Sequence, residues 1–175
     1  MALQRLRDEF RRAWSALAAL DRQVVFILVV VPLLVIIQQN LGSRSLFREH
    51  LAGYFPAEWS GILSWAWWFG MQGVLGFLIP VLVLIFVFRR KPREIGLGAG
   101  DWKLATTLAI IYIPLVVIGT WFLSDSPAFQ AKYPHYGPAA TDWQVFLIYE
   151  MLFLFYWVGW EYLWRGFMLF GTARV

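Results

Sequence analysis

Three charged side chains near the end of the chain have the residue types and the separation expected of an acid–base site. Glu161 and Arg165 stand in GWEYLWRGFMLFG, residues 159–171, which is otherwise mostly aromatic and aliphatic. On a helix, residues four apart share a face, and Glu150, eleven residues before Glu161, lies only about 20° away. A carboxylate held by an arginine can act as a general base or acid. The same pair can instead fix the depth and packing of a helix, and the spacing leaves both interpretations open.

Charged side chains in such a stretch are expected to face protein or a wet cavity, because an ionised group at the bilayer centre costs at least a few kcal/mol. At about 1.5 Å per residue, Glu150 lies roughly 16 Å from Glu161 along the helix. We therefore predict one inward-facing charged stripe. Glu150 we interpret as a structural carboxyl, protonated or hydrogen-bonded.

The elements that must position this stripe are membrane helices. Hydrophobic residues make up 60% of the 175-residue chain and charged residues only 15%, outside the range of soluble domains. Crossing about 30 Å of hydrocarbon takes roughly 20 helical residues. We predict an all-α integral membrane protein with about four transmembrane helices, at about residues 24–40, 61–88, 104–124 and 145–171.

The basic residues predict an orientation. Residues 1–23 and 89–103 each carry five of them, whereas the loop after the first span has only Arg44 and Arg48 and the loop after the third only Lys132. The positive-inside rule then places both termini in the cytoplasm, with the chain in the cell membrane. Because these residues flank membrane segments, the expected partner is the lipid bilayer, and no nucleic acid is expected.

The chain divides into two predicted domains. In residues 1–23, apolar side chains recur at helical spacing opposite arginines, which predicts an amphipathic helix on the cytoplasmic surface. Residues 24–175 are predicted to form the four-span transmembrane domain. The apolar run of the first span ends in Q-Q-N-L-G, residues 38–42, without an A-x-A-like cleavage site, so we expect a signal anchor and not a cleaved signal peptide.

Several short patterns predict local structure. Asp101 and Asp142 stand directly before the third and fourth spans, where aspartate can cap a helix. The glycines at 70, 73 and 76 offer a smooth ridge for a neighbouring helix. A tryptophan cluster at 59, 65, 67 and 68 is typical of an interfacial belt, with a ligand cage as the alternative.

The residue types of the sequence do not indicate a metal site or a cofactor site. The chain has no cysteine, and its two histidines, His50 and His135, fall on different loops without ligand-like spacing. We therefore expect neither a metal site nor a bound cofactor.

The stretch W-E-Y-L-W-R-G-F, residues 160–167, resembles the first motif, E-E-x-x-x-R with a following glycine, of the CAAX prenyl protease and bacteriocin-processing (CPBP) family of intramembrane endopeptidases. The stretches P-R-E-I-G-L-G-A-G-D-W and F-Q-A-K-Y-P also suit the resemblance. It implies that Glu161 is the second motif glutamate, Arg165 the arginine and Gly166 the glycine. Trp160 stands in place of the first glutamate, a variant similar to a W-E-x-x-x-R-G subgroup.

The resemblance also implies what the site needs. In the family the acidic motif works with histidines of later helices, in patterns resembling F-x-x-x-H and H-x-x-x-N, and neither pattern occurs in these 175 residues. General acid–base catalysis contributes only about 10²- to 10⁴-fold without stabilisation of the oxyanion. Glu161 and Arg165 are therefore candidate catalytic residues by motif, with Glu150 on the same face, but we do not expect this chain to be an active peptidase alone.

Our first hypothesis is an active-site-truncated CPBP relative that serves as a non-catalytic accessory or partner in membrane-protein processing or sorting. Its partners are the bilayer and another membrane protein or protease. One alternative is the N-terminal half of a split or interrupted CPBP-type glutamate-dependent endopeptidase, whose histidine helices are supplied elsewhere. Another is a small membrane scaffold or immunity protein.

Overall fold

The computed structural model describes residues 2–18 and 21–173 and is all-helical over them, without a strand. Four helical stretches are long and apolar enough to cross a membrane, which confirms the all-α membrane class. They are Arg22–Tyr54, Ala57–Val87, Trp102–Ser124 and Trp143–Phe170. Residues 1, 19–20 and 174–175 belong to the two predicted domains and lie outside the described part of the chain.

The described residues form α-helices, π-helical segments and 3₁₀ segments, several of which follow one another directly within a span. The α-helices are α1 (Ala2–Ala18), α2 (Arg22–Asn40), α3 (Arg44–Leu46), α4 (Ala57–Gly73), α5 (Ile79–Leu82), α6 (Trp102–Ser124), α7 (Pro127–Gln130) and α8 (Trp143–Glu161). The π-helical segments are η1 (Phe47–Leu51), η3 (Val74–Leu78), η4 (Val83–Val87) and η7 (Tyr162–Phe170). The 3₁₀ segments are η2 (Ala52–Tyr54), η5 (Pro92–Ile95) and η6 (Gly137–Ala140).

Aspartates cap three of the long helices, as the sequence predicts for two of them. Asp101 Oδ1 accepts a hydrogen bond from the Leu104 amide at 3.0 Å and begins α6. Asp142 Oδ1 accepts from the Gln144 amide at 2.8 Å and begins α8. Asp21 caps α2 in the same way. Each carboxylate satisfies an amide that has no partner inside its helix and favours the positive end of the helix dipole.

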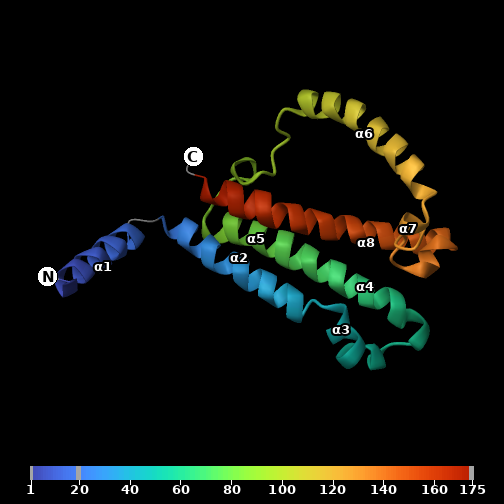
Figure 1. Ribbon diagram of the computed structural model, residues 1–175, viewed down its shortest axis with the longest axis horizontal. Helices are drawn as coiled ribbons and strands as arrows, with labels where there is room; N and C mark the ends of the chain where they lie inside the picture. Colours follow the sequence, from blue (N-terminus) through green and yellow to red (C-terminus); the bar gives the residue numbers. More distant parts are fainter. Residues whose placement is uncertain (1, 19–20, 174–175) are drawn as a thin grey trace.

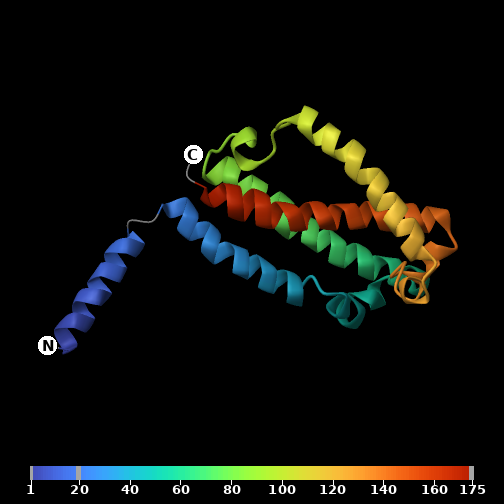
Figure 2. The same cartoon turned by 45° about the horizontal axis from the view of Figure 1, so that its top comes forward.

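Helices α2, α4 and α8 lie side by side and form the bundle (Figures 1 and 2). The backbones of α8 and of the second span touch at Gly76 and Gly159. A Cβ on Gly76 would overlap the Gly159 backbone, and a Cβ on Gly159 would overlap the backbone of Gln72 and Gly73 at the end of α4. The ridge predicted from the glycines is therefore confirmed at Gly76, and also at Gly73, where a Cβ would overlap the Phe155 ring. Around Gly70 the structure leaves open space.

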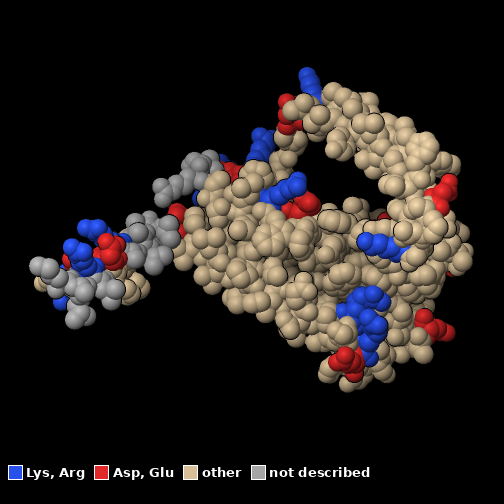
Figure 3. All heavy atoms as spheres, viewed as in Figure 1, with Lys and Arg blue, Asp and Glu red and all other residues tan. Residues whose placement is uncertain are grey.

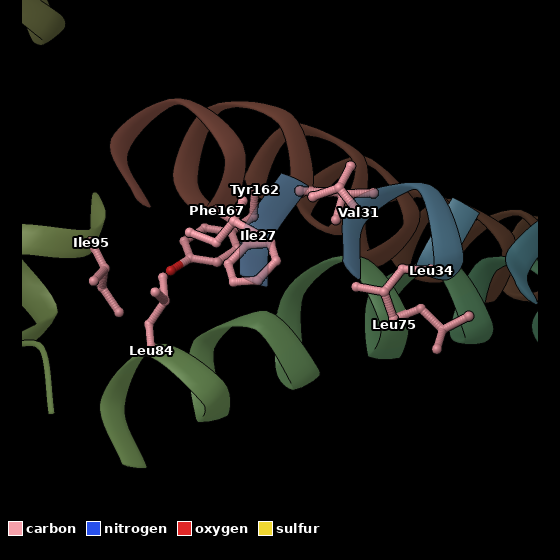
Figure 4. Packing of buried hydrophobic residues seen from close by; sticks show 9 residues of the cluster. Ile27, Val31, Leu34, Leu75, Leu84, Ile95, Tyr162 and Phe167 are labelled. Carbon is pink, nitrogen blue, oxygen red and sulfur yellow. The ribbon is translucent and has the colours of Figure 1, made fainter. Parts of the chain in front are cut away.

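We call the end of the bundle where α2 begins and η7 ends the clamp end. An apolar cluster closes it. Ile27 of α2, Leu84 of η4 and Phe167 of η7 are each fully buried, and Figure 4 shows them converging from three segments far apart in the sequence. The cluster consists of Ile27, Val31, Leu34, Leu75, Leu84, Ile95, Tyr162, Leu163 and Phe167.

A buried polar clamp seals the same end. Gln23 Nε2 donates to the Gly171 carbonyl at 2.6 Å, and Arg90 Nε donates to Gln23 Oε1 at 2.8 Å. Gln23 is 7% exposed, so its amide joins the start of α2, the chain after η4 and the residue after η7 away from solvent.

The opposite end, which we call the loop end, carries residues 41–56 and 125–142. Here Trp65 and Phe69 of α4 pack against Tyr149 of α8, each with ring centroids 5.4 Å from the Tyr149 ring. Ala139 of η6 completes this aromatic cluster. Contacts between aromatic side chains therefore hold the loop end together.

Helix α6 stands outside the bundle. None of its residues is buried, and its first half is separated from α8 in both ribbon views (Figures 1 and 2). Figure 3 shows an opening between α6 and the rest of the molecule. The described residues therefore leave one side of α8 uncovered.

Candidate functional site

Glu161 and Arg165 lie on either side of a change in helix type. Glu161 is the last residue of α8, and Arg165 belongs to the π-helical segment η7. A wider helical turn of this kind is frequent at functional sites. Gly166 is buried beneath the Tyr162 ring, and a Cβ there would overlap that ring. The glycine of the motif thus lets η7 pack as it does.

The two side chains form an ion pair. The Arg165 Nε lies 3.0 Å from Glu161 Oε2, within hydrogen-bond distance, while 74% of the Arg165 and 46% of the Glu161 side chain remains exposed. The pair is not buried inside the bundle, so the prediction of an inward-facing stripe is wrong for these residues. The physical reason is that η7 turns its apolar residues, among them Leu163 and Phe167, into the clamp-end cluster. The charged positions between them are left on the other face.

Glu150 does not join this pair. It is half-buried in α8, eleven residues from Glu161, which amounts to about 16 Å along the helix axis. The ion pairs within the described residues are Arg165–Glu161 and Arg12–Glu9, so Glu150 takes part in neither. The structure thus brings together two of the three charged residues singled out from the sequence.

The histidines lie at the loop end, away from the ion pair. His135 stacks on Trp65, with ring centroids 6.3 Å apart, and His50 Nδ1 lies 3.3 Å from the Leu46 carbonyl. In the described part of the chain, no three His, Cys, Asp or Glu side chains gather where they could hold a metal ion. Of the groups that acid–base hydrolysis needs, Glu161 supplies a carboxylate and Arg165 the cation that positions it.

The loop end holds a feature that the sequence predictions missed. A cavity of about 790 Å³ opens between α2, α4 and α8, and its lining includes Arg44, Arg48 and the rings of Phe153 and Trp157. Trp65 is only 5% exposed and also lines the cavity, so it is a wall residue and not part of an interfacial belt.

Two signals in the sequence pointed to this cavity. Arg44 and Arg48 stand four residues apart directly after the first span, and the ligand cage was the alternative interpretation of the tryptophan cluster. Neither signal shows by itself that α8 forms the opposite wall of the cavity.

The chain was compared with models of known families, with curated proteins and with solved structures, and nothing matched.

Proposed function

We propose that this chain is a membrane-embedded relative of the CPBP endopeptidases that serves as a non-catalytic partner of another membrane protein, in the processing or sorting of membrane-anchored proteins. The observation that carries the proposal is the Glu161–Arg165 ion pair, which lies within a membrane span on a face that no described helix covers.

An exposed ion pair within a membrane span is more stable when another protein shields it from lipid. Charged side chains within membrane spans usually face protein or water, because lipid solvates them poorly. Pairing at 3.0 Å lowers this cost but leaves most of the Arg165 side chain exposed. A second membrane protein with polar or charged side chains on the uncovered side of α8 would remove the remaining cost. The pair therefore suits recognition of a partner helix.

The orientation follows from charge. We propose that both termini and the clamp end face the cytoplasm and that the loop end faces outward, since the basic residues concentrate in 1–23 and 89–103. Helix α1 then lies on the cytoplasmic leaflet. Phe10 and Trp14, which are exposed and stacked on each other, would enter the acyl region while arginines meet the headgroups.

The test is recovery of the partner. The tagged chain is expressed in its native membrane, cross-linked, solubilised and purified, and the co-purified membrane proteins are quantified by mass spectrometry. We expect Glu161→Gln and Arg165→Gln each to reduce recovery of the principal partner at least about tenfold, because each leaves the other charge unpaired at the interface. The matched control is Glu9→Gln, which breaks the exposed ion pair of α1.

The outcomes separate the hypotheses. Unchanged recovery with both span variants would show that the pair is not an interaction site. Rescue by the swapped pair, Glu161→Arg with Arg165→Glu, would mean that a simple ion pair suffices. The split endopeptidase has support in the 46% exposure of Glu161, which leaves the carboxylate accessible to incoming histidines. It predicts that Glu161→Gln keeps the partner bound and abolishes peptide cleavage by the complex.

A further inference from the structure

The cavity at the loop end is polar at one end and apolar along its length. Arg44, Arg48 and His135 line it at the junction of the loops with the helices, and Phe153, Trp157 and Trp160 line it farther along α8. Figure 3 shows Lys and Arg side chains gathered over α3. The cavity therefore has the polarity of an amphiphile.

Hydrogen bonds and a ring contact hold the two arginines in place, and neither forms an ion pair within residues 2–18 and 21–173. The Arg44 guanidinium lies 3.5 Å from the centroid of the Trp65 ring, and its Nε donates to Ser64 Oγ at 3.4 Å. Arg48 Nε donates to the Arg44 carbonyl at 3.2 Å. Within the described residues, neither arginine has an acidic side chain within ion-pair distance. Two neighbouring guanidinium groups without a counter-charge favour an anion, and guanidinium suits phosphate in particular.

Two buried polar atoms in the cavity wall also lack a partner. Tyr149 is 3% exposed and Gln38 is 5% exposed, and both residues line the cavity. The Tyr149 hydroxyl and Gln38 Oε1 make no hydrogen bond, although the Gln38 amide nitrogen donates to the Trp68 carbonyl at 3.1 Å. Leaving a buried polar atom unpaired costs free energy, and because both atoms are closed to solvent, a ligand in the cavity reaches them only if adjacent side chains shift.

The dimensions fit a lipid. From Tyr149 to Trp160, which stand eleven positions apart, the cavity follows α8 for about 16 Å, close to half of the roughly 30 Å hydrocarbon core. That is the depth of one leaflet, the length over which a lipid chain extends below its headgroup. Trp157 is 44% exposed, so the cavity is open on one side and a lipid can enter laterally.

From these observations we infer that the loop end binds a lipid with a phosphate headgroup. Arg44 and Arg48 hold the phosphate, and one acyl chain lies against Phe153, Trp157 and Trp160. The Tyr149 hydroxyl, which is closed to solvent in the empty cavity, donates to a headgroup oxygen once adjacent side chains shift. The inference uses none of the residues that carry the proposed function, so either can fail without the other.

The experiment is native mass spectrometry of the full chain in detergent, titrated with dioleoyl phosphatidate or dioleoyl phosphatidylcholine. We expect a one-to-one complex with phosphatidate and binding to phosphatidylcholine at least about tenfold weaker, because its choline masks the phosphate charge. Arg44→Gln with Arg48→Gln should weaken phosphatidate binding by at least about tenfold. Arg93→Gln with Lys103→Gln, which removes two exposed charges elsewhere, should leave binding unchanged.

The result can overturn the inference in three ways. Equal binding of the two lipids, or unchanged binding by the Arg44 and Arg48 double variant, would remove the role of the arginines. Displacement of the lipid by an equal concentration of inorganic phosphate would show that the apolar part of the cavity is not used. Arg48→Gln alone, which keeps the Arg44–Trp65 contact, guards against misfolding and should weaken phosphatidate binding by about threefold.

Discussion

The two ends of the bundle differ in how their buried glutamine side chains are bonded, Gln23 at the clamp end and Gln38 at the loop end. At the clamp end both polar groups of the Gln23 amide are bonded, one to Arg90 and one to the Gly171 carbonyl. At the loop end the Tyr149 hydroxyl and Gln38 Oε1 are buried without a partner, beside a cavity lined by two arginines. Satisfied polar groups hold helices together, whereas unsatisfied ones in a cavity wall leave room for a ligand. The difference indicates a structural end and a binding end.

The first prediction asks whether the two ends face different compartments. The chain has no cysteine, so Gly98→Cys near the clamp end and Gly137→Cys at the loop end introduce single labelling sites, and neither Cβ would overlap neighbouring atoms. We expect an impermeant maleimide added to intact cells to label position 137 fully and position 98 not at all. The reverse pattern would overturn the orientation inferred from the basic residues.

The second prediction removes the clamp. Gln23→Leu leaves the Gly171 carbonyl and the Arg90 guanidinium without their buried partner, and we expect it to lower the free energy of unfolding by about 2 to 3 kcal/mol. Unfolding is followed by circular dichroism during a titration of mixed micelles with denaturing detergent. Gln144→Leu, at an exposed glutamine, is the control. A loss no greater than that of the control would mean that the clamp does not hold the helices.

The third prediction concerns the loop end. Tyr149→Phe removes a buried hydroxyl that has no partner, so without anionic lipid we expect it to raise the free energy of unfolding by about 1 kcal/mol. The same titration in a neutral detergent measures this. A destabilised Tyr149→Phe variant would show that the hydroxyl already has a partner in the empty protein.

Tyr162→Phe supplies the matched control for that variant. Tyr162 carries an equally unpartnered hydroxyl, but it lies in the clamp-end cluster and not in the cavity. It should stabilise the protein to a similar extent and leave phosphatidate binding unchanged, whereas Tyr149→Phe should weaken that binding. If both variants changed binding alike, the contrast between the two ends would disappear.

Features that depend on a few adjacent residues were predictable from the sequence. Hydropathy gave the four spans because a helix in lipid must be apolar over about 20 residues, wherever its neighbours lie. Asp101 and Asp142 were predictable as caps because a cap bonds to amides two or three residues away. The glycine ridge required only that a small side chain permits close approach.

Features that depend on neighbouring helices were not predictable in the same way. The direction in which Glu161 and Arg165 point is set by the packing of η7 into the clamp-end cluster, and helical spacing alone suggested the opposite face. The loop-end cavity joins residues more than 100 positions apart, such as Arg44 and Tyr149. The role of Glu161 as a member of a CPBP-like site stays a prediction that rests on its motif.

The contact between Gly76 and Gly159 is a point about which the two helices can pivot. The two backbones touch there without side chains between them, so the helices can change their crossing angle at this point but cannot come closer. Apart from Trp160, the α8 residues that line the cavity lie on one side of Gly159, and Glu161 and Arg165 lie on the other. Any widening of the bundle at the loop end is therefore accompanied by a tilt of the segment that carries the ion pair.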